Sequence, residues 1–250
     1  MDFGVKIKES DGNLILDFKQ NIENWKRYVS ELVNDKVILD IKNTKKLLEE
    51  QGDTIVYEVY NLWKSVEKFK RIFEKVGIAC DITYLNFGVF STSEEGELFS
   101  TYGHLHEKEY GETYTVLKND CFLVLSDRKT SDTLIVLLKQ GNSIFIHPKF
   151  FHRLTCYKKD SLVVGLTAKN TGHNYSIIKN KGFPFHLFFD NRKKKLKIER
   201  NKIYKKSNYK IIKGINSKLD PIKLLEKNPE KLKDILEKPE KYEKLYFMGD

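Results

Sequence analysis

The chain has 250 residues, of which 40% are hydrophobic and 12% aromatic, enough for one sizeable core and too apolar for intrinsic disorder. It contains no run of 18 apolar residues and no basic-then-apolar N-terminus, so we expect neither membrane insertion nor export, and predict a cytoplasmic protein. The net charge of +10 resides entirely in residues 192–250, which hold 19 basic and 9 acidic residues, so any argument from charge to a partner concerns this segment alone.

The first third of the chain is predicted to mix strands and helices. The segment 54–61 is rich in β-branched and aromatic residues, which is typical of a strand. Apolar residues then recur at helical spacing until Gly77, a helix stop signal. In chain order we expect short strands over 1–17 around the turn Ser10-Asp11-Gly12, helices near 21–33 and 41–51, a strand over 54–61, and an amphipathic helix over 63–77.

From about residue 82 to 190 the pattern changes to short β-type segments separated by turn signals. Many short strands at such spacing favour an all-β sandwich or barrel. The clearest segments are 82–91, 112–117, 121–125, 133–138, 143–146 and 161–166.

The segment 192–250 is predicted to be a separate, basic and partly helical extension of a domain formed by 1–191. It contains three pieces that start at Pro221, Pro229 and Pro239, and proline is tolerated in the first turn of a helix. Residues 192–213 hold eleven basic residues and one acidic residue, so one hypothesis is an arm that binds nucleic acid. We favour the alternative of a solvated extension packed on the barrel or across a dimer, because charge runs are usually solvated faces.

The most informative motif is His104-Leu-His106 on a β-type segment. In a strand, residues i and i+2 face the same side, so both imidazoles can converge on one point inside a barrel. Glu112 opens the next predicted strand and His152 lies on a later one. Three imidazoles and one carboxylate suit Fe, Mn, Ni, Co or Zn better than Ca or Mg. His147 and His186 fit no such position and are predicted to be structural.

The order Gly103-His-x-His, then Glu, then Gly141 followed eleven residues later by His resembles the two-part motif of the cupins. Over most of residues 1–191 the chain resembles the cupin-type phosphoglucose (glucose-6-phosphate) isomerases. The matching stretches are 3–6, 55–60, 85–87, 101–106, 112–114, 141–153, 172–175 and 181–183.

This resemblance implies an all-β, jelly-roll-like double-stranded β-helix that forms a homodimer. It also implies a metal-dependent aldose–ketose isomerase that interconverts glucose 6-phosphate and fructose 6-phosphate, or a closely related sugar phosphate. His104, His106, Glu112 and His152 match the metal ligands, with Fe²⁺ expected first and Mn²⁺, Zn²⁺, Ni²⁺ or Co²⁺ as alternatives. The implied catalytic residues are Glu112, as the base for proton transfer between C1 and C2, His173 and Tyr175. The implied sugar-phosphate-binding residues are Tyr57, Thr101, Gly103 and Tyr175.

Three positions depart from the family pattern. Phe90 stands where a phosphate-contacting Thr is usual, Thr167 where an active-site Tyr is usual, and Tyr102 where a Lys is usual. A ring at Phe90 removes a hydrogen bond and is expected to narrow the pocket. The chain shows no obvious Arg or Lys cradle, so we expect hydroxyl and backbone groups to hold the phosphate. An alternative hypothesis is therefore a non-catalytic, metal-containing cupin that binds a sugar or sugar phosphate as a sensor.

Overall fold

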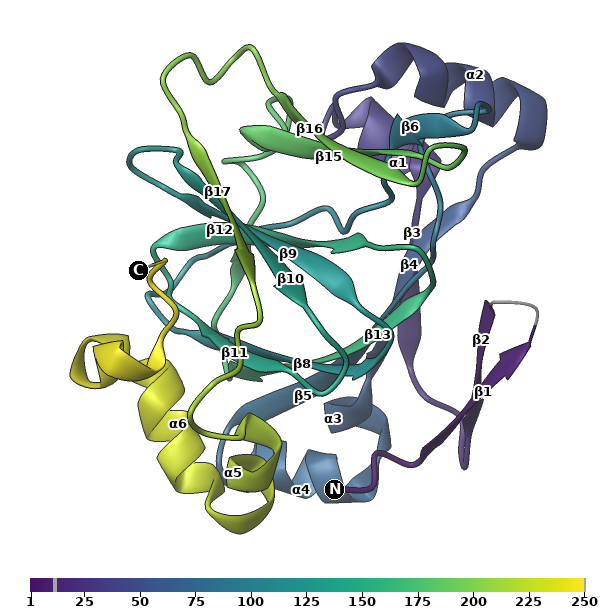
Figure 1. Ribbon diagram of the computed structural model, residues 1–250. Helices are drawn as coiled ribbons and strands as arrows, with labels where there is room; N and C mark the ends of the chain where they lie inside the picture. Colours follow the sequence, from purple (N-terminus) through teal and green to yellow (C-terminus); the bar gives the residue numbers. More distant parts are fainter. Residues whose placement is uncertain (11–12, 250) are drawn as a thin grey trace.

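Two curved β-sheets face each other and enclose the main core (Figure 1). The structure is a computed structural model that describes residues 1–10 and 13–249. The larger sheet has the order β11 (Ser143–Ile146), β8 (Glu112–Lys118), β13 (Ser161–Ala168), β5 (Ile78–Leu85), β4 (Ile55–Asn61) and β3 (Asn24–Tyr28). The smaller has the order β12 (Phe150–Cys156), β9 (Cys121–Asp127), β10 (Thr133–Leu138) and β17 (Tyr209–Lys213). This arrangement confirms the predicted cupin barrel.

The larger sheet is buried on both faces. In β13, Val163 belongs to the core between the sheets, whereas Leu162, Val164 and Leu166 belong to a second core on the outer face. Because successive side chains of a strand point to opposite faces, a strand covered on both sides becomes a continuous apolar run.

Helices cover the outer face of this sheet (Figure 1). They are α3 (Leu62–Ser65), α4 (Glu67–Lys75), α5 (Pro221–Lys227) and α6 (Pro229–Glu237), followed by the 3-10 helix η1 (Pro239–Leu245). The three proline-led pieces of the sequence are thus three helical segments. The Asp220 side chain accepts hydrogen bonds from the first turn of α5, and the Asn228 side chain accepts one from the first turn of α6. The helix expected over 63–77 is present but breaks at Val66, which has an extended conformation.

The remaining elements lie around the barrel. They are the ribbon β1 (Val5–Ser10) and β2 (Asn13–Phe18), the helices α1 (Val29–Asn34) and α2 (Ile41–Gln51), the pair β7 (Leu105–His106) and β14 (His173–Asn174), and the sheet β16 (Lys195–Arg200), β15 (Phe185–Asp190) and β6 (Glu95–Glu97). Of the turn expected at 10–12, Asp11 and Gly12 lie outside the described residues.

The helix predicted near 21–33 was wrong in its first half. Residues Asn24–Tyr28 form β3, which pairs antiparallel with β4, and α1 begins only at Val29. The edge of β4 offers backbone hydrogen-bond partners to this segment, so pairing between the two strands outweighs the local helical propensity. The strand expected over 82–91 is also shifted. It begins at Ile78 and ends at Leu85, and the backbone N–H and side chain of Asn86 then donate to Val56 and Ile55 of β4.

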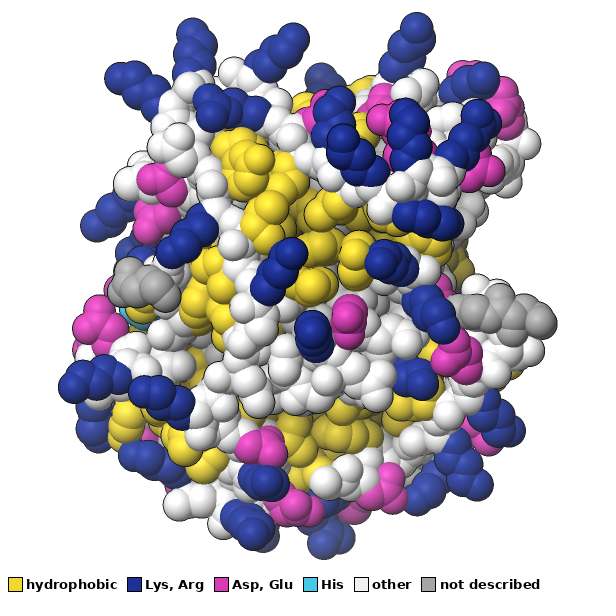
Figure 2. All heavy atoms as spheres, in the orientation of Figure 1, with side chains coloured by type: hydrophobic (Ala, Val, Ile, Leu, Met, Phe, Trp, Pro, Cys, Tyr) yellow, Lys and Arg dark blue, Asp and Glu magenta, His cyan; other side chains and the backbone are white. Residues whose placement is uncertain are grey.

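The basic segment 192–250 lies against the barrel along much of its length. Strand β16 pairs with β15, β17 adds to β10 in parallel, and α6 contacts β13. Figure 2 shows Lys and Arg side chains along the upper rim, and Ile203, Tyr209 and Ile211 are exposed hydrophobic residues of this segment. The boundary at residue 191 stays a prediction and falls between the paired strands β15 and β16. Within the described part of the chain, no helix is both long and apolar enough to cross a membrane.

Candidate metal centre and active-site cavity

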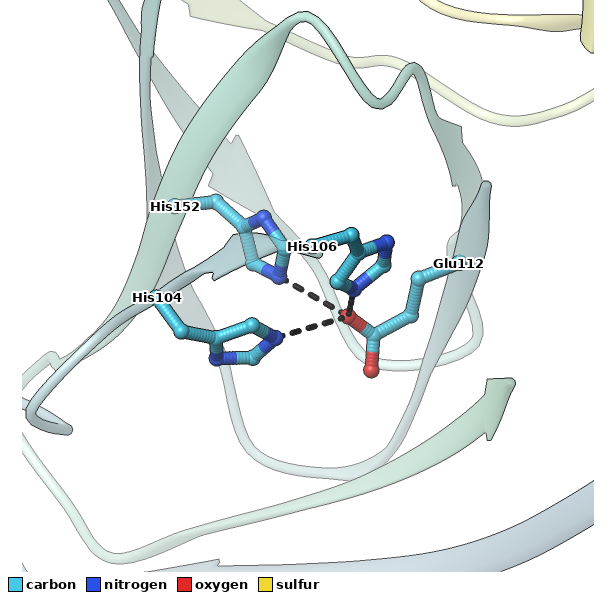
Figure 3. A group of neighbouring side chains, drawn as sticks. All are labelled: His104, His106, Glu112 and His152. Atoms are coloured by element: carbon cyan, nitrogen blue, oxygen red, sulfur yellow. Dashed lines mark hydrogen bonds and ion pairs between the residues drawn. The ribbon is translucent and has the colours of Figure 1, made fainter. Parts of the chain in front are cut away.

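Four side chains converge inside the barrel: His104, His106, Glu112 and His152 (Figure 3). Their candidate ligand atoms all lie within 4.8 Å of one another. Glu112 Oε2 lies 2.8 Å from His152 Nε2, 3.3 Å from His106 Nε2 and 3.7 Å from His104 Nε2. Three Nε2 atoms therefore point at one carboxylate oxygen.

Backbone pairing places these residues next to one another. His104 and His152 form an antiparallel bridge in which each backbone N–H donates to the other's carbonyl oxygen, at 3.1 and 3.0 Å. His106 follows on β7, and Glu112 is the first residue of β8. The His-x-His spacing thus sends both imidazoles to the same side, where β12 and β8 supply the other two groups.

The hydrogen bonds of the far ring nitrogens orient two imidazoles toward the centre. His106 Nδ1 lies 2.6 Å from the Tyr110 carbonyl oxygen, and His152 Nδ1 lies 3.4 Å from that of Phe150. A carbonyl only accepts, so Nδ1 donates and Nε2 is the nitrogen that faces the centre, as in metal-binding histidines. His104 Nε2 is buried and has no hydrogen-bond partner in 1–10 and 13–249. The cluster fits a metal ion of the first transition row.

The pKa shifts of Glu112 and His104 favour the protonation states in which these side chains bind metals. Burial opposes ionisation of Glu112, but contacts with the imidazoles of His104, His106 and His152 outweigh it and hold the carboxyl pKa well below its usual range. Burial and the neighbouring His152 hold the pKa of His104 well below its usual range. An ionised carboxylate and a neutral imidazole are the states in which these side chains bind metals.

The cluster opens into two connected cavities. The inner cavity of about 90 Å³ contains His104 and Glu112 in its wall, and the outer cavity of about 570 Å³ adjoins it. Both are lined by Trp25, Val59, Asp81, Thr167, His173 and Tyr175. The structure therefore brings the expected substrate-site residues together around the cluster. Those that line the inner cavity are Tyr57, Thr101, Gly103, His173 and Tyr175.

Comparison with known proteins supplies the family. Residues 30–204 match the family model described as glucose-6-phosphate isomerase. The chain belongs to this family. It is 30% identical over 183 residues to glucose-6-phosphate isomerase of Thermococcus litoralis, covering 72% of this chain and 89% of that protein. It is 27% identical over 171 residues to the enzyme of the same name from Pyrococcus horikoshii, covering 67% of this chain and 84% of that protein.

Matches to solved structures are more distant. An oxalate oxidase aligns with a TM-score of 0.32 and 15% identity, over 39% of this chain and 45% of the oxidase. Oxalate decarboxylase of B. subtilis aligns with a TM-score of 0.35 and 10% identity, over 46% of this chain and 26% of the decarboxylase. The cupin assignment rests instead on the two facing sheets and their strand order.

The family departures have different structural consequences. Thr167 lines both cavities, so a smaller hydroxyl stands where the family usually has a Tyr. Phe90 is fully buried, packs against Phe99 and lies outside the described walls of both cavities, so it does not narrow them as expected. The hydroxyl of Tyr102 donates to Asp35, 3.0 Å away, and its ring belongs to the core.

Sequence reasoning missed several cavity residues. Asp81 and Thr83 on β5 line the inner cavity, and Arg27 and Lys169 line the outer one. The alternation of β5 could have indicated Asp81 and Thr83 as facing one side. No signal pointed to Arg27, because it lay in a segment predicted to be helical.

The two remaining histidines have structural partners, as predicted. His186 is fully buried, with Nδ1 2.5 Å from Glu97 Oε1 and Nε2 3.0 Å from the Phe183 carbonyl oxygen. His147 Nδ1 accepts a hydrogen bond from the backbone N–H of Lys149.

Gly103 is essential for the placement of His104. It has φ +81°, and a Cβ there would lie 2.6 Å from the Phe183 ring and 2.8 Å from the His152 carbonyl oxygen. We expect Gly103→Ala to destabilise the protein by about 1–3 kcal/mol and to reduce bound metal, as measured by thermal unfolding and elemental analysis. Gly141→Ala is the matched control, because Gly141 has φ +85° but no atom within 4 Å of its added Cβ. Equal metal loss in both variants would show that backbone strain alone, and not the clash, perturbs the site.

Proposed function

We propose that the protein is a metal-dependent isomerase that interconverts glucose 6-phosphate and fructose 6-phosphate. The observation that carries this proposal is the convergence of Glu112 and three imidazoles beside a cavity whose wall contains Glu112 and His104, within a member of the glucose-6-phosphate isomerase family. The inner cavity alone is small for a sugar phosphate, so the substrate extends into the outer cavity.

In this proposal Glu112 moves the proton between C1 and C2 of the substrate. Its carboxylate lies at the centre of the cluster, where burial excludes bulk water. His104, His106, Glu112 and His152 would hold the metal, with Fe²⁺ our first expectation. A bound divalent ion supplies a positive charge that stabilises the negative charge developing on the substrate oxygens. His173 and Tyr175, whose Nδ1 and hydroxyl lie 3.4 Å apart, orient the substrate at the junction of the cavities.

In this proposal the charged residues of the two cavities favour the phosphate group in the outer cavity. The Glu112 carboxylate lines only the inner cavity, Arg27 and Lys169 line only the outer cavity, and Asp81 lines both. One terminal nitrogen of the Arg27 guanidinium donates to Glu31 Oε1, 2.6 Å away, while its buried Nε lacks a hydrogen-bond partner among the residues that the structure describes. The guanidinium also lies 5.4 Å from the Trp25 ring centre and 5.5 Å from that of Tyr102. A dianionic phosphate is therefore favoured beside Arg27.

Arg27→Met keeps the apolar stem of this side chain and removes its charge. We expect the KM for glucose 6-phosphate to rise about 10- to 100-fold, the effect of losing a charged hydrogen bond, with a smaller change in kcat. Steady-state kinetics test this, with Arg71→Met on α4 as the control because Arg71 lies outside the two described cavity walls and pairs with Glu67. An unchanged KM in Arg27→Met would mean that the phosphate lies elsewhere.

The direct test of the proposed function is a coupled assay on purified protein loaded separately with Fe²⁺, Mn²⁺, Zn²⁺, Ni²⁺ or Co²⁺. We expect interconversion of the two hexose phosphates that depends on the metal. If the metal-loaded protein is instead stabilised by a hexose phosphate in thermal-shift experiments and makes no product, that result would support the sensor hypothesis. The expected homodimer, the cytoplasmic location and the disfavoured nucleic-acid arm stay predictions.

A further inference from the structure

A second carboxylate, Asp81, lies in the same cavity wall as Glu112. It belongs to β5 and is paired with Gly165 of β13, and it lines both the inner and the outer cavity. A Cβ at Gly165 would lie 3.3 Å from Glu112 Oε1, so the glycine leaves the space between the two acidic positions open. Asp81 thus stands where the two cavities meet.

The surroundings of Asp81 do not satisfy its carboxylate. Its Oδ1 is buried and lacks a hydrogen-bond partner among the described residues. Burial and the charge of Glu112 raise the pKa of Asp81 to about 7, while Lys64 and a hydrogen bond from Trp63 lower it. An unpaired buried carboxylate oxygen is costly for folding, and such groups call for a functional explanation.

The chemistry of the cavity limits what Asp81 can bind. Asp81 is outside the four-residue cluster whose ligand atoms converge, so it is not placed to complete that metal site. A phosphate next to a carboxylate is disfavoured by like charge. A carboxylate accepts hydrogen bonds strongly from hydroxyl groups, which are the other polar groups of a sugar phosphate.

We propose that Asp81 is a specificity-determining residue that accepts a hydrogen bond from a hydroxyl group of the sugar phosphate at the junction of the two cavities. The proposal rests on the proposed function of this site. The Trp63 side chain of α3 donates a hydrogen bond to the carboxylate, which links α3 to substrate recognition. With Arg27 in the wall of the outer cavity, Asp81 orients the chain of hydroxyls inward and the phosphate toward Arg27.

The first test measures binding of sorbitol 6-phosphate, which has the hydroxyls and phosphate of the substrate but no carbonyl to isomerise. We expect Asp81→Ala to weaken binding by calorimetry about 10- to 100-fold, because a charged hydrogen bond is lost. Glu58→Gln on the adjacent strand β4 is the control, because Glu58 pairs with Lys26 and is outside both described cavity walls. It is expected to bind as the wild type does.

The second test pairs these variants with five analogues of sorbitol 6-phosphate, each of which lacks one of the hydroxyls on carbons 1 to 5. If Asp81 accepts a hydrogen bond from one of these hydroxyls, the analogue that lacks it binds wild type and Asp81→Ala with equal affinity. Each of the other analogues still binds Asp81→Ala more weakly than wild type, by the same factor as sorbitol 6-phosphate. An Asp81→Ala penalty of the same size for every analogue would overturn the proposal.

Thermal unfolding separates this role from a structural one. Removal of an unpaired buried carboxylate is expected to leave the melting temperature of Asp81→Asn and Asp81→Ala equal to or above that of the wild type. A lower melting temperature together with unchanged binding would mean that Asp81 is structural, and would overturn the proposal. If wild-type protein turns over hexose phosphates and Asp81→Ala binds normally, only this inference fails. If the wild type neither binds nor converts them, the proposed function fails as well.

Discussion

Replacing Glu112 with glutamine is expected to lower kcat for the interconversion of glucose 6-phosphate and fructose 6-phosphate by about 10²- to 10⁴-fold. The amide has nearly the shape of the carboxylate but cannot accept the proton that moves between C1 and C2. The amide also carries no negative charge at the metal centre, where Glu112 Oε2 lies within 3.7 Å of three imidazole nitrogens. Steady-state kinetics and elemental analysis of the same preparation measure the two effects together.

The two roles of Glu112 can be separated by comparing metal content with turnover. A variant that keeps metal but loses turnover identifies Glu112 chiefly as the base, whereas loss of both identifies it chiefly as a ligand. Glu95→Gln is the control, because Glu95 is an exposed residue of β6 outside both described cavity walls. Activity near the wild-type value in Glu112→Gln would contradict the proposed mechanism.

The second large effect is expected on stability, from a buried charged network behind the metal centre. Glu97 is fully buried, with Oε1 2.5 Å from His186 Nδ1 and 4.0 Å from the Arg153 guanidinium. Its Oε2 accepts from the backbone N–H groups of Leu39 and Asp40, at 2.6 and 3.1 Å. We expect Glu97→Gln to lower the free energy of unfolding by about 3–5 kcal/mol, because it leaves the Arg153 charge buried without its partner. Denaturant unfolding measures this.

A double variant and a pH series test the cause. Glu97→Met combined with Arg153→Met removes both charges and is expected to be more stable than Glu97→Gln. Burial raises the pKa of Glu97, but His186 and Arg153 lower it more, so its pKa lies below the ordinary value of 4.5. Its ionised form therefore stabilises the protein above pH 4.5 and loses this effect as the pH falls through the folded pKa. The difference in the free energy of unfolding between wild type and Glu97→Gln should become smaller below pH 4.5. A difference that does not change with pH would contradict the stabilising role of ionised Glu97.

Local pattern was sufficient for much of the fold. The strands at 133–138 and 143–146 appear with the predicted bounds, because their apolar runs end at turn residues. The proline-led helices were also predictable, since proline at a first turn is a local signal. The sequence failed at Asn24–Tyr28, where the edge of β4 converts a helical pattern into strand β3.

The candidate metal centre was predictable because alternation puts His104 and His106 on one face and because the order of Gly103-His-x-His, Glu112 and His152 resembles the cupin motif. The sequence by itself thus determined the β-rich core and the side-chain types of the centre. Only the tertiary structure decided that Asp81 and Arg27 line the same outer cavity. The physical reason is that the neighbours of a strand are set by sheet order, here β8–β13–β5–β4–β3, which joins residues far apart in the chain. Packing against Phe99 places Phe90 in the core instead of the pocket, which no local pattern could reveal.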